Sequence, residues 1–195
     1  MNNKQSIEYF LNIFYLILQW YFTLMLFMKI IPTVSIYNIH SQLGQLQTLI
    51  VLYIITHKND FYTAYTFAIS YYIFDLIQMV VLQYRRNINE NIIFSFHHLI
   101  CMYVMYMNDE LYYPLVYRLE LSNLALIAYY HFKHVTAYKR YINIMIFCWY
   151  TYFRVFSLVP YYSLTYQLTS FMYTIWFMFY VMGIYWSFKL LRQCC

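Results

Sequence analysis

Seven long apolar runs, separated by short polar or charged breaks, set the strongest limit on what this 195-residue chain can fold into. A helix that crosses a membrane needs about 20 apolar residues, with a range of about 17–25. Only 10% of the residues are charged and 64% are apolar, whereas a soluble domain carries about 25% charged residues. The pattern therefore predicts an all-α membrane protein with about seven transmembrane helices. The runs cover residues 7–28, 41–56, 61–84, 92–107, 111–131, 141–163 and 168–190.

The basic residues predict the orientation of the chain. With seven spans, eight Lys and Arg lie in loops on one side of the membrane and two on the other. Cytosolic loops carry the excess of Lys and Arg, so we expect a lumenal N-terminus and a cytosolic C-terminus, in the endoplasmic reticulum or a related endomembrane. The first run lacks a small-residue cleavage site, which predicts an uncleaved signal anchor. The basic residues are dispersed in ones and twos, so we expect no nucleic-acid partner.

Two cysteines, Cys194 and Cys195, follow the last run on the predicted cytosolic side. Cysteines next to a membrane can be palmitoylated, and a terminal cysteine pair can be prenylated. Unmodified thiols in a reducing compartment are the alternative. The sequence leaves both interpretations open.

Six ionisable residues lie inside the predicted spans, where each costs at least about 2.5–3.5 kcal/mol on insertion scales. One interpretation is structural ion pairing of Asp75 or Glu120 with an arginine. The other is a buried polar site that several helices build around one interior cavity. The six residues, from four different runs, are Asp75, His97, His98, Arg118, Glu120 and Arg154.

The adjacent pair His97 and His98 is the most informative part of this set, because imidazole is partly neutral near pH 7 and still moves protons. Neighbouring helical residues point about 100° apart, so one histidine is expected to face the cavity and the other to orient it or bond a neighbouring helix. Helical metal ligands are usually four residues apart, and we expect no metal. Glu120 is the carboxylate expected to reach the pair. A His–carboxylate pair suits acyl transfer and equally suits holding a lipid head group.

The run 111–131 is polar in its middle. Glu120 and Asn123 are three residues apart, so they share one surface of a helix. Arg118 and Ser122 are four residues apart and share another. Together the four side chains cover over half of the helix circumference, so this helix is expected to line a cavity or to be surrounded by protein rather than lipid.

Four short segments, taken in order and spacing, resemble the TLC domain family of multi-pass membrane proteins. The likeness covers residues 41–192, nearly the whole chain. The first two segments are the histidine segment and a later acidic one, and the others are an aspartate segment and a helix with a lone arginine. They are residues 96–99 (FHHL), 120–122 (ELS), 70–76 (SYYIFDL) and 153–154 (FR).

The resemblance implies a domain over 41–192 whose six helices form a barrel around a tunnel for a lipid chain. Residues 1–40 are then an additional N-terminal helix and loop, and 193–195 a short cytosolic tail. Ceramide synthases, the enzymes of this family, transfer an acyl group from acyl-CoA to a sphingoid amine, using the histidine pair and a later His-Asp-x-x-Asp segment. Here residues 119–123 read LELSN, so Asn123 replaces the second acid and the full synthase set is absent.

We therefore predict a TLC-type protein that binds or redistributes lipid and alters membrane lipid composition. The alternative is a ceramide-synthase-like lipid N-acyltransferase, in which His97 or His98 is the base, Glu120 orients it and acyl-CoA is the co-substrate. A channel or transporter and a purely structural membrane protein are the remaining interpretations. No other cofactor is expected, and the lipid and the oligomeric state stay open. The candidate lipid-binding residues are Asp75, Arg118, Asn123 and Arg154.

Overall fold

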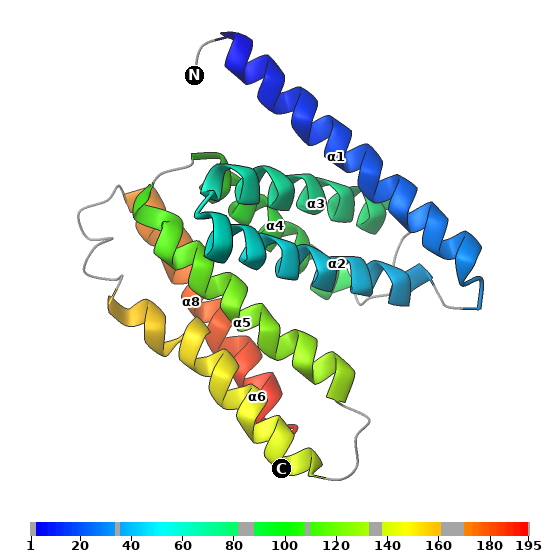
Figure 1. The fold of residues 1–195 in the computed structure, drawn as a ribbon. Helices are drawn as coiled ribbons and strands as arrows, with labels where there is room; N and C mark the ends of the chain where they lie inside the picture. Colours follow the sequence, from blue (N-terminus) through cyan, green and yellow to red (C-terminus); the bar gives the residue numbers. More distant parts are fainter. Residues whose placement is uncertain are drawn as a thin grey trace. The chain divides into compact units, whose positions relative to one another are not determined.

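Every regular element in the described part of the chain is a helix (Figure 1), as the sequence predicts. The chain divides into two compact units, unit 1 (Met1–Glu110) and unit 2 (Leu111–Cys195). Each predicted apolar run overlaps one of the helices. The computed structural model describes residues 3–33, 36–81, 88–107, 110–132, 138–160 and 170–194.

Unit 1 is built around α3, which packs against three other helices of the unit. Its mean hydropathy is high, and the residues that it buries lie on several of its faces, as expected for a helix with neighbours on more than one side. The helices of unit 1 are α1 (Asn3–Ile30), α2 (Ile36–Tyr53), a π-helical extension of α2 named η1 (Ile54–Lys58), α3 (Phe61–Val81) and α4 (Ile88–Met107).

Helix α1 packs on α3 along one stripe of its surface. Tyr9, Ile13, Trp20 and Leu24 are buried there, at the spacing of one helical face. The indole Nε1 of Trp20 donates a hydrogen bond of 3.2 Å to Ser70 Oγ on α3. The helix that the family resemblance sets outside the six-helix domain is thus an integral part of unit 1.

The chain turns from η1 into α3 at two polar residues. Asn59 adopts a left-handed conformation, with φ of 50°, and ends η1. Asp60 caps α3, because its Oδ1 accepts a hydrogen bond of 2.9 Å from the Thr63 backbone N–H and its Oδ2 accepts one of 2.6 Å from the Thr63 hydroxyl. Such a cap satisfies an N–H group that has no partner within the helix.

Unit 2 has α6 at its centre, packed against α5 on one side and α8 on the other. Successive helices run antiparallel (Figure 1). A small core joins all three helices and consists of Ala125, Ile146, Tyr150 and Leu190. The elements of unit 2 are α5 (Tyr113–Phe132), α6 (Lys139–Arg154), the 3₁₀ turn η3 (Phe156–Leu158) and α8 (Ser170–Leu191), and a 3₁₀ turn, η2 (Glu110–Tyr112), lies at the boundary of the two units.

Two helices differ in extent from the predicted runs. α6 ends at Arg154, well before the end of the predicted run 141–163, and Val155 leaves the helical conformation with φ of −120°. α2 begins at Ile36, earlier than the predicted run 41–56. The earlier start of α2 arises where the polar side chain of His40 is buried, since hydropathy alone does not place such a residue inside a helix.

Two helices in the described residues are long and apolar enough to cross a membrane, Ser6–Ile30 and Tyr173–Leu191. The apolar window within Ser6–Ile30 is only 17% buried, and the outer face of α1 exposes large apolar side chains such as Phe10, Phe14 and Phe22. These helices support a membrane protein by length and composition, and seven spans stay a prediction.

Candidate functional site

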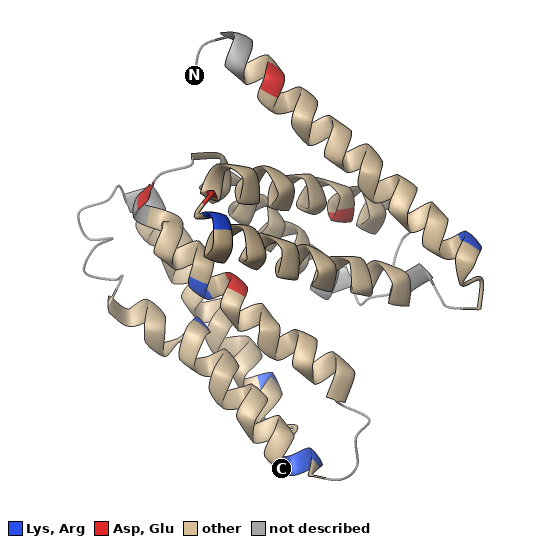
Figure 2. Cartoon of the chain, viewed as in Figure 1, with Lys and Arg blue, Asp and Glu red and all other residues tan. Residues whose placement is uncertain are grey.

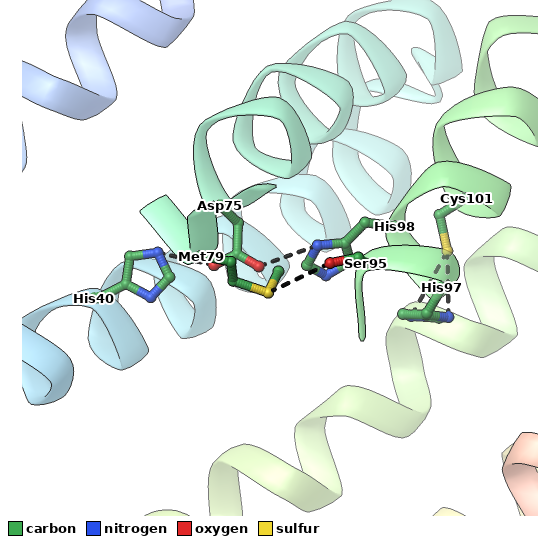
Figure 3. A network of polar contacts seen from close by, with 7 residues as sticks. All are labelled: His40, Asp75, Met79, Ser95, His97, His98 and Cys101. Carbon is green, nitrogen blue, oxygen red and sulfur yellow. Dashed lines mark hydrogen bonds and ion pairs between the residues drawn. The ribbon is translucent and has the colours of Figure 1, made fainter. Parts of the chain in front are cut away.

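A buried carboxylate held between two histidines is the main polar feature of unit 1. Asp75 Oδ1 lies 2.8 Å from His40 Nε2, and Asp75 Oδ2 lies 3.0 Å from His98 Nδ1. The three residues come from α3, α2 and α4, and each is less than 10% exposed. Figure 3 shows Asp75 between the two imidazole rings. One side chain of the central helix thus ties the two flanking helices together.

Aromatic side chains of α3 hold both imidazoles in place. The ring of His98 stacks on Tyr72, with centroids 4.7 Å apart. The ring of His40 lies 5.6 Å from that of Phe74 and 6.3 Å from that of Tyr71. These three aromatic residues immediately precede Asp75 in the chain, so one turn of α3 supplies both the carboxylate and the walls around it.

His97 faces away from this carboxylate, toward Cys101 one turn along α4 (Figure 3). Its ring nitrogens lie 3.7 Å from Cys101 Sγ, and its side chain is half-buried. The two histidines therefore diverge as adjacent helical residues must. Next to them, Ser95 Oγ lies 3.9 Å from Met79 Sδ, which joins α4 to α3 a second time.

The arrangement allows proton transfer and charge pairing. A carboxylate and one protonated imidazole neutralise each other, and the second imidazole stays available as a neutral base or a further hydrogen-bonding group. Removing one partner of such a buried pair destabilises the protein, because the other charge is then unpaired and away from water. Among the described residues, no three His, Cys, Asp or Glu side chains are grouped in a way that could hold a metal ion.

A second buried cluster lies in unit 2 and centres on Arg154. Its Nε donates to Ser122 Oγ at 2.6 Å and its Nη2 donates to Asn123 Oδ1 at 3.1 Å. Asn123 Nδ2 in turn donates to Glu120 Oε2 at 3.1 Å. The amide of Asn123 therefore connects the buried carboxylate of Glu120 to the buried guanidinium of Arg154, across α5 and α6. This confirms that Glu120 and Asn123 share a helix surface.

Helix α8 approaches the backbone of Arg154 closely at Gly183. A Cβ added at Gly183 would lie 2.7 Å from the Arg154 backbone oxygen and 3.1 Å from the Arg154 Cβ. Only glycine fits at this point without a shift of α6 or α8. Ser187, one turn further, donates to the Gly183 carbonyl at 2.8 Å.

Arg118 makes a hydrogen bond within its own helix. Its Nη1 donates to the Pro114 backbone oxygen at 3.1 Å, one turn earlier on the same helix. This contact is local to the first turns of α5.

The predicted site residues thus gather in two sets. Asp75 and His98 meet in unit 1, while Glu120, Asn123 and Arg154 meet in unit 2. The pairing of Asp75 with an arginine, which the sequence suggested, is replaced by contacts with two histidines. A single cavity shared by His97, His98 and Glu120 stays a prediction.

Sequence reasoning missed His40, which it assigned to a loop before the second run. A signal was present, because His40, Leu43 and Gln47 recur at three- and four-residue spacing, and all three are buried on one face of α2. A hydropathy window begins at the first continuous apolar stretch and so excludes a polar residue in the first turns of a buried helix.

Comparison of the chain with protein-family models, with curated proteins and with solved structures gave no match.

Proposed function

We propose that this chain is a multi-pass membrane protein of TLC type that binds or redistributes lipid and thereby alters membrane lipid composition. The observation that carries the proposal is the meeting of the segments on which the resemblance depends. His98 of the FHHL segment contacts Asp75 of the SYYIFDL segment, and Arg154 bonds Ser122 of the ELS segment. Segments far apart in the sequence therefore form two buried polar clusters.

The distribution of polar and apolar side chains supports placement in a membrane. Large apolar residues cover the outer face of α1, and ionisable residues such as Asp75 and Arg154 are buried between helices. Ionisable groups within a membrane usually face the interior of the bundle and mark a functional site. The proposal includes seven spans, a lumenal N-terminus, a cytosolic C-terminus, six helices around a lipid tunnel and an endoplasmic reticulum or related location.

A lipid N-acyltransferase is the second candidate, favoured by the contact of His98 with Asp75. In that activity Asp75 orients the His98 ring through Nδ1, and Nε2 is the base that accepts an N–H proton as the neutral amine attacks the acyl-CoA thioester. The C–N bond of the amide forms, the thioester C–S bond breaks, and the CoA thiolate leaves with that proton. Glu120, which the sequence suggested for this role, accepts a hydrogen bond from Asn123 in unit 2. Acyl-CoA is then the co-substrate.

Lipid profiling tests the proposal. Cells that express the chain are expected to show a changed lipid composition compared with cells that do not. The His98→Ala variant is expected to lose the change because Asp75 loses its partner, whereas His57→Ala, at an exposed position, retains it. Unchanged lipid profiles at equal protein levels would contradict lipid handling.

An assay of purified protein separates the two candidates. With a sphingoid base and acyl-CoA as substrates, we expect no ceramide product from the unsubstituted chain. Ceramide formation that is lost on His98→Ala, by the roughly 10²–10⁴-fold typical of removing a general base, would instead establish the acyltransferase.

A further inference from the structure

The antiparallel packing of unit 2 brings cationic residues together at one end of the bundle. Asn143 Nδ2, in the second turn of α6, donates a hydrogen bond of 2.7 Å to the backbone oxygen of Gln193, just after α8. The beginning of α6 and the end of α8 are therefore adjacent, and Figure 2 shows the blue of Lys and Arg there. We name this the basic end, and it consists of Lys139, Arg140, Lys189 and Arg192.

The charge of unit 2 is strongly one-sided. The sequence of this unit contains seven Lys and Arg and a single acidic residue, Glu120. Glu120 is buried and reaches, through Asn123, the guanidinium of Arg154 at the opposite end of α6. That end lies about 22 Å along the helix from Lys139, at 1.5 Å per residue. The carboxylate of Glu120 is therefore too distant to neutralise the basic end.

Aromatic side chains surround the same cations. Lys189 Nζ lies 4.6 Å from the ring centroid of Trp186 and 5.4 Å from that of Tyr185. Tyr138 and Tyr141, beside Lys139 and Arg140, are 76% and 69% exposed. Tyr and Trp next to basic residues are typical of the level at which a helix leaves the hydrocarbon and meets the lipid head groups.

We propose that the basic end of unit 2 binds the head groups of anionic phospholipids. This inference rests on the proposed insertion in a membrane. It adds the class of lipid that the basic end binds. Arg140 and Arg192 offer planar guanidinium groups that bind phosphate oxygens in pairs, and both are exposed. An anionic lipid surface attracts Lys and Arg close to it, whereas a zwitterionic head group presents no net charge.

The test is lipid competition on the purified full-length chain. The protein in mild detergent receives equal amounts of phosphatidylglycerol and phosphatidylcholine with identical acyl chains, and native mass spectrometry counts the bound lipids. We expect preferential binding of phosphatidylglycerol. The double variant Arg140→Gln/Arg192→Gln is expected to lose roughly tenfold or more of that preference, given the contribution of each cation near an anionic surface.

A matched control removes two exposed cations from unit 1. Lys29→Gln/Lys58→Gln lowers the net charge by the same amount, and we expect it to keep the preference. The inference is overturned if both double variants lose the preference for phosphatidylglycerol equally, or if the unsubstituted chain shows no such preference. It is also overturned if millimolar inorganic phosphate displaces all of the bound lipid. These outcomes are separate from failure of the proposed function, which the lipid profile reports, and from failure of insertion, which extraction at alkaline pH reports.

Discussion

Asp75 is the residue on which the polar interior of unit 1 depends, because its two oxygens serve histidines from two different helices. Each histidine is buried against aromatic rings of α3, so neither can turn to water without disturbing that packing. The carboxylate is thus both a charge partner and a structural tie between α2 and α4. Removal of the carboxylate is therefore expected to weaken the packing of both α2 and α4 on α3.

Replacing Asp75 by Asn keeps the shape of the side chain and removes its charge. We expect Asp75→Asn to lower the free energy of unfolding by about 3–5 kcal/mol, the cost of breaking a buried ion pair by removing one partner. Thermal unfolding in detergent, followed by tryptophan fluorescence, measures the change. His57→Ala, at an exposed histidine, is the control and is expected to change stability by no more than about 0.5 kcal/mol. Equal stabilities of Asp75→Asn and the unsubstituted protein would refute the structural role.

At the scale of elements, the two glycines of the chain mark close approaches between helices. At Gly183 an added Cβ would meet the backbone of Arg154, while at Gly44 it would meet the hydroxyl of Tyr71 at 2.6 Å. Backbone atoms move only with their helix, whereas the end of a side chain can rotate. The two positions therefore differ in how much they tolerate a methyl group.

This difference gives a paired prediction. Gly183→Ala is expected to destabilise the protein by about 1–3 kcal/mol, the typical cost of overpacking a close contact, because α6 and α8 must separate. Gly44→Ala is expected to cost less, since only the Tyr71 hydroxyl must move. Unfolding of both variants under the same conditions gives the comparison. The interpretation fails if Gly44→Ala is the more damaging of the two.

The cap of α3 makes a small, pH-dependent contribution to stability. The hydrogen bonds from Thr63 lower the pKa of Asp60 below its ordinary value, because they favour the charged carboxylate. The contribution is therefore present above about pH 3.9, the ordinary Asp pKa, and is lost as the pH falls through the lower pKa of the folded protein. Asp60→Ala is expected to cost about 0.5–2 kcal/mol at pH 7.

Unfolding at pH 7 and near pH 3 checks the sign. The difference in free energy of unfolding between the unsubstituted protein and Asp60→Ala is expected to be smaller at the lower pH. Asp60→Asn, which also caps helices, is expected to retain most of the stability at pH 7. If this difference in free energy of unfolding is larger at the lower pH, the role of the charged cap is contradicted.

Hydropathy predicted the existence and approximate range of the helices, because each helix buries or exposes a continuous apolar surface. It predicted less well which polar groups pair, since pairing depends on packing between helices rather than on spacing along one helix. Glu120 and Asn123 were grouped correctly because both lie on α5. His40 and Asp75 were not, because the turn at Asn59 and Asp60 determines how α2 returns along α3.

At the scale of the whole molecule, the two units differ in charge. Unit 1 contains five Lys and Arg and six Asp and Glu, so all of the net positive charge of the chain belongs to unit 2. The positive-inside rule then makes unit 2 the stronger determinant of orientation, and it predicts that the basic end lies on the cytosolic side.

Glycosylation mapping tests this orientation. An acceptor site fused after Cys195 is expected to stay unglycosylated, and one fused before Met1 is expected to be glycosylated, because only the lumenal side has the modifying enzyme. Glycosylation at the C-terminus, or at neither terminus of a protein shown to be membrane-inserted, would contradict the predicted topology.

The hydrogen bond between Trp20 and Ser70 also has a consequence for biosynthesis. The indole belongs to a helix that leaves the ribosome before α3, and its acceptor is fifty residues further along the chain. Until α3 has been synthesised, the inward face of α1 has neither this acceptor nor the aromatic rings of Phe67 and Tyr71 that surround the indole. Helix α1 therefore completes its docking in unit 1 only after α3 has been synthesised.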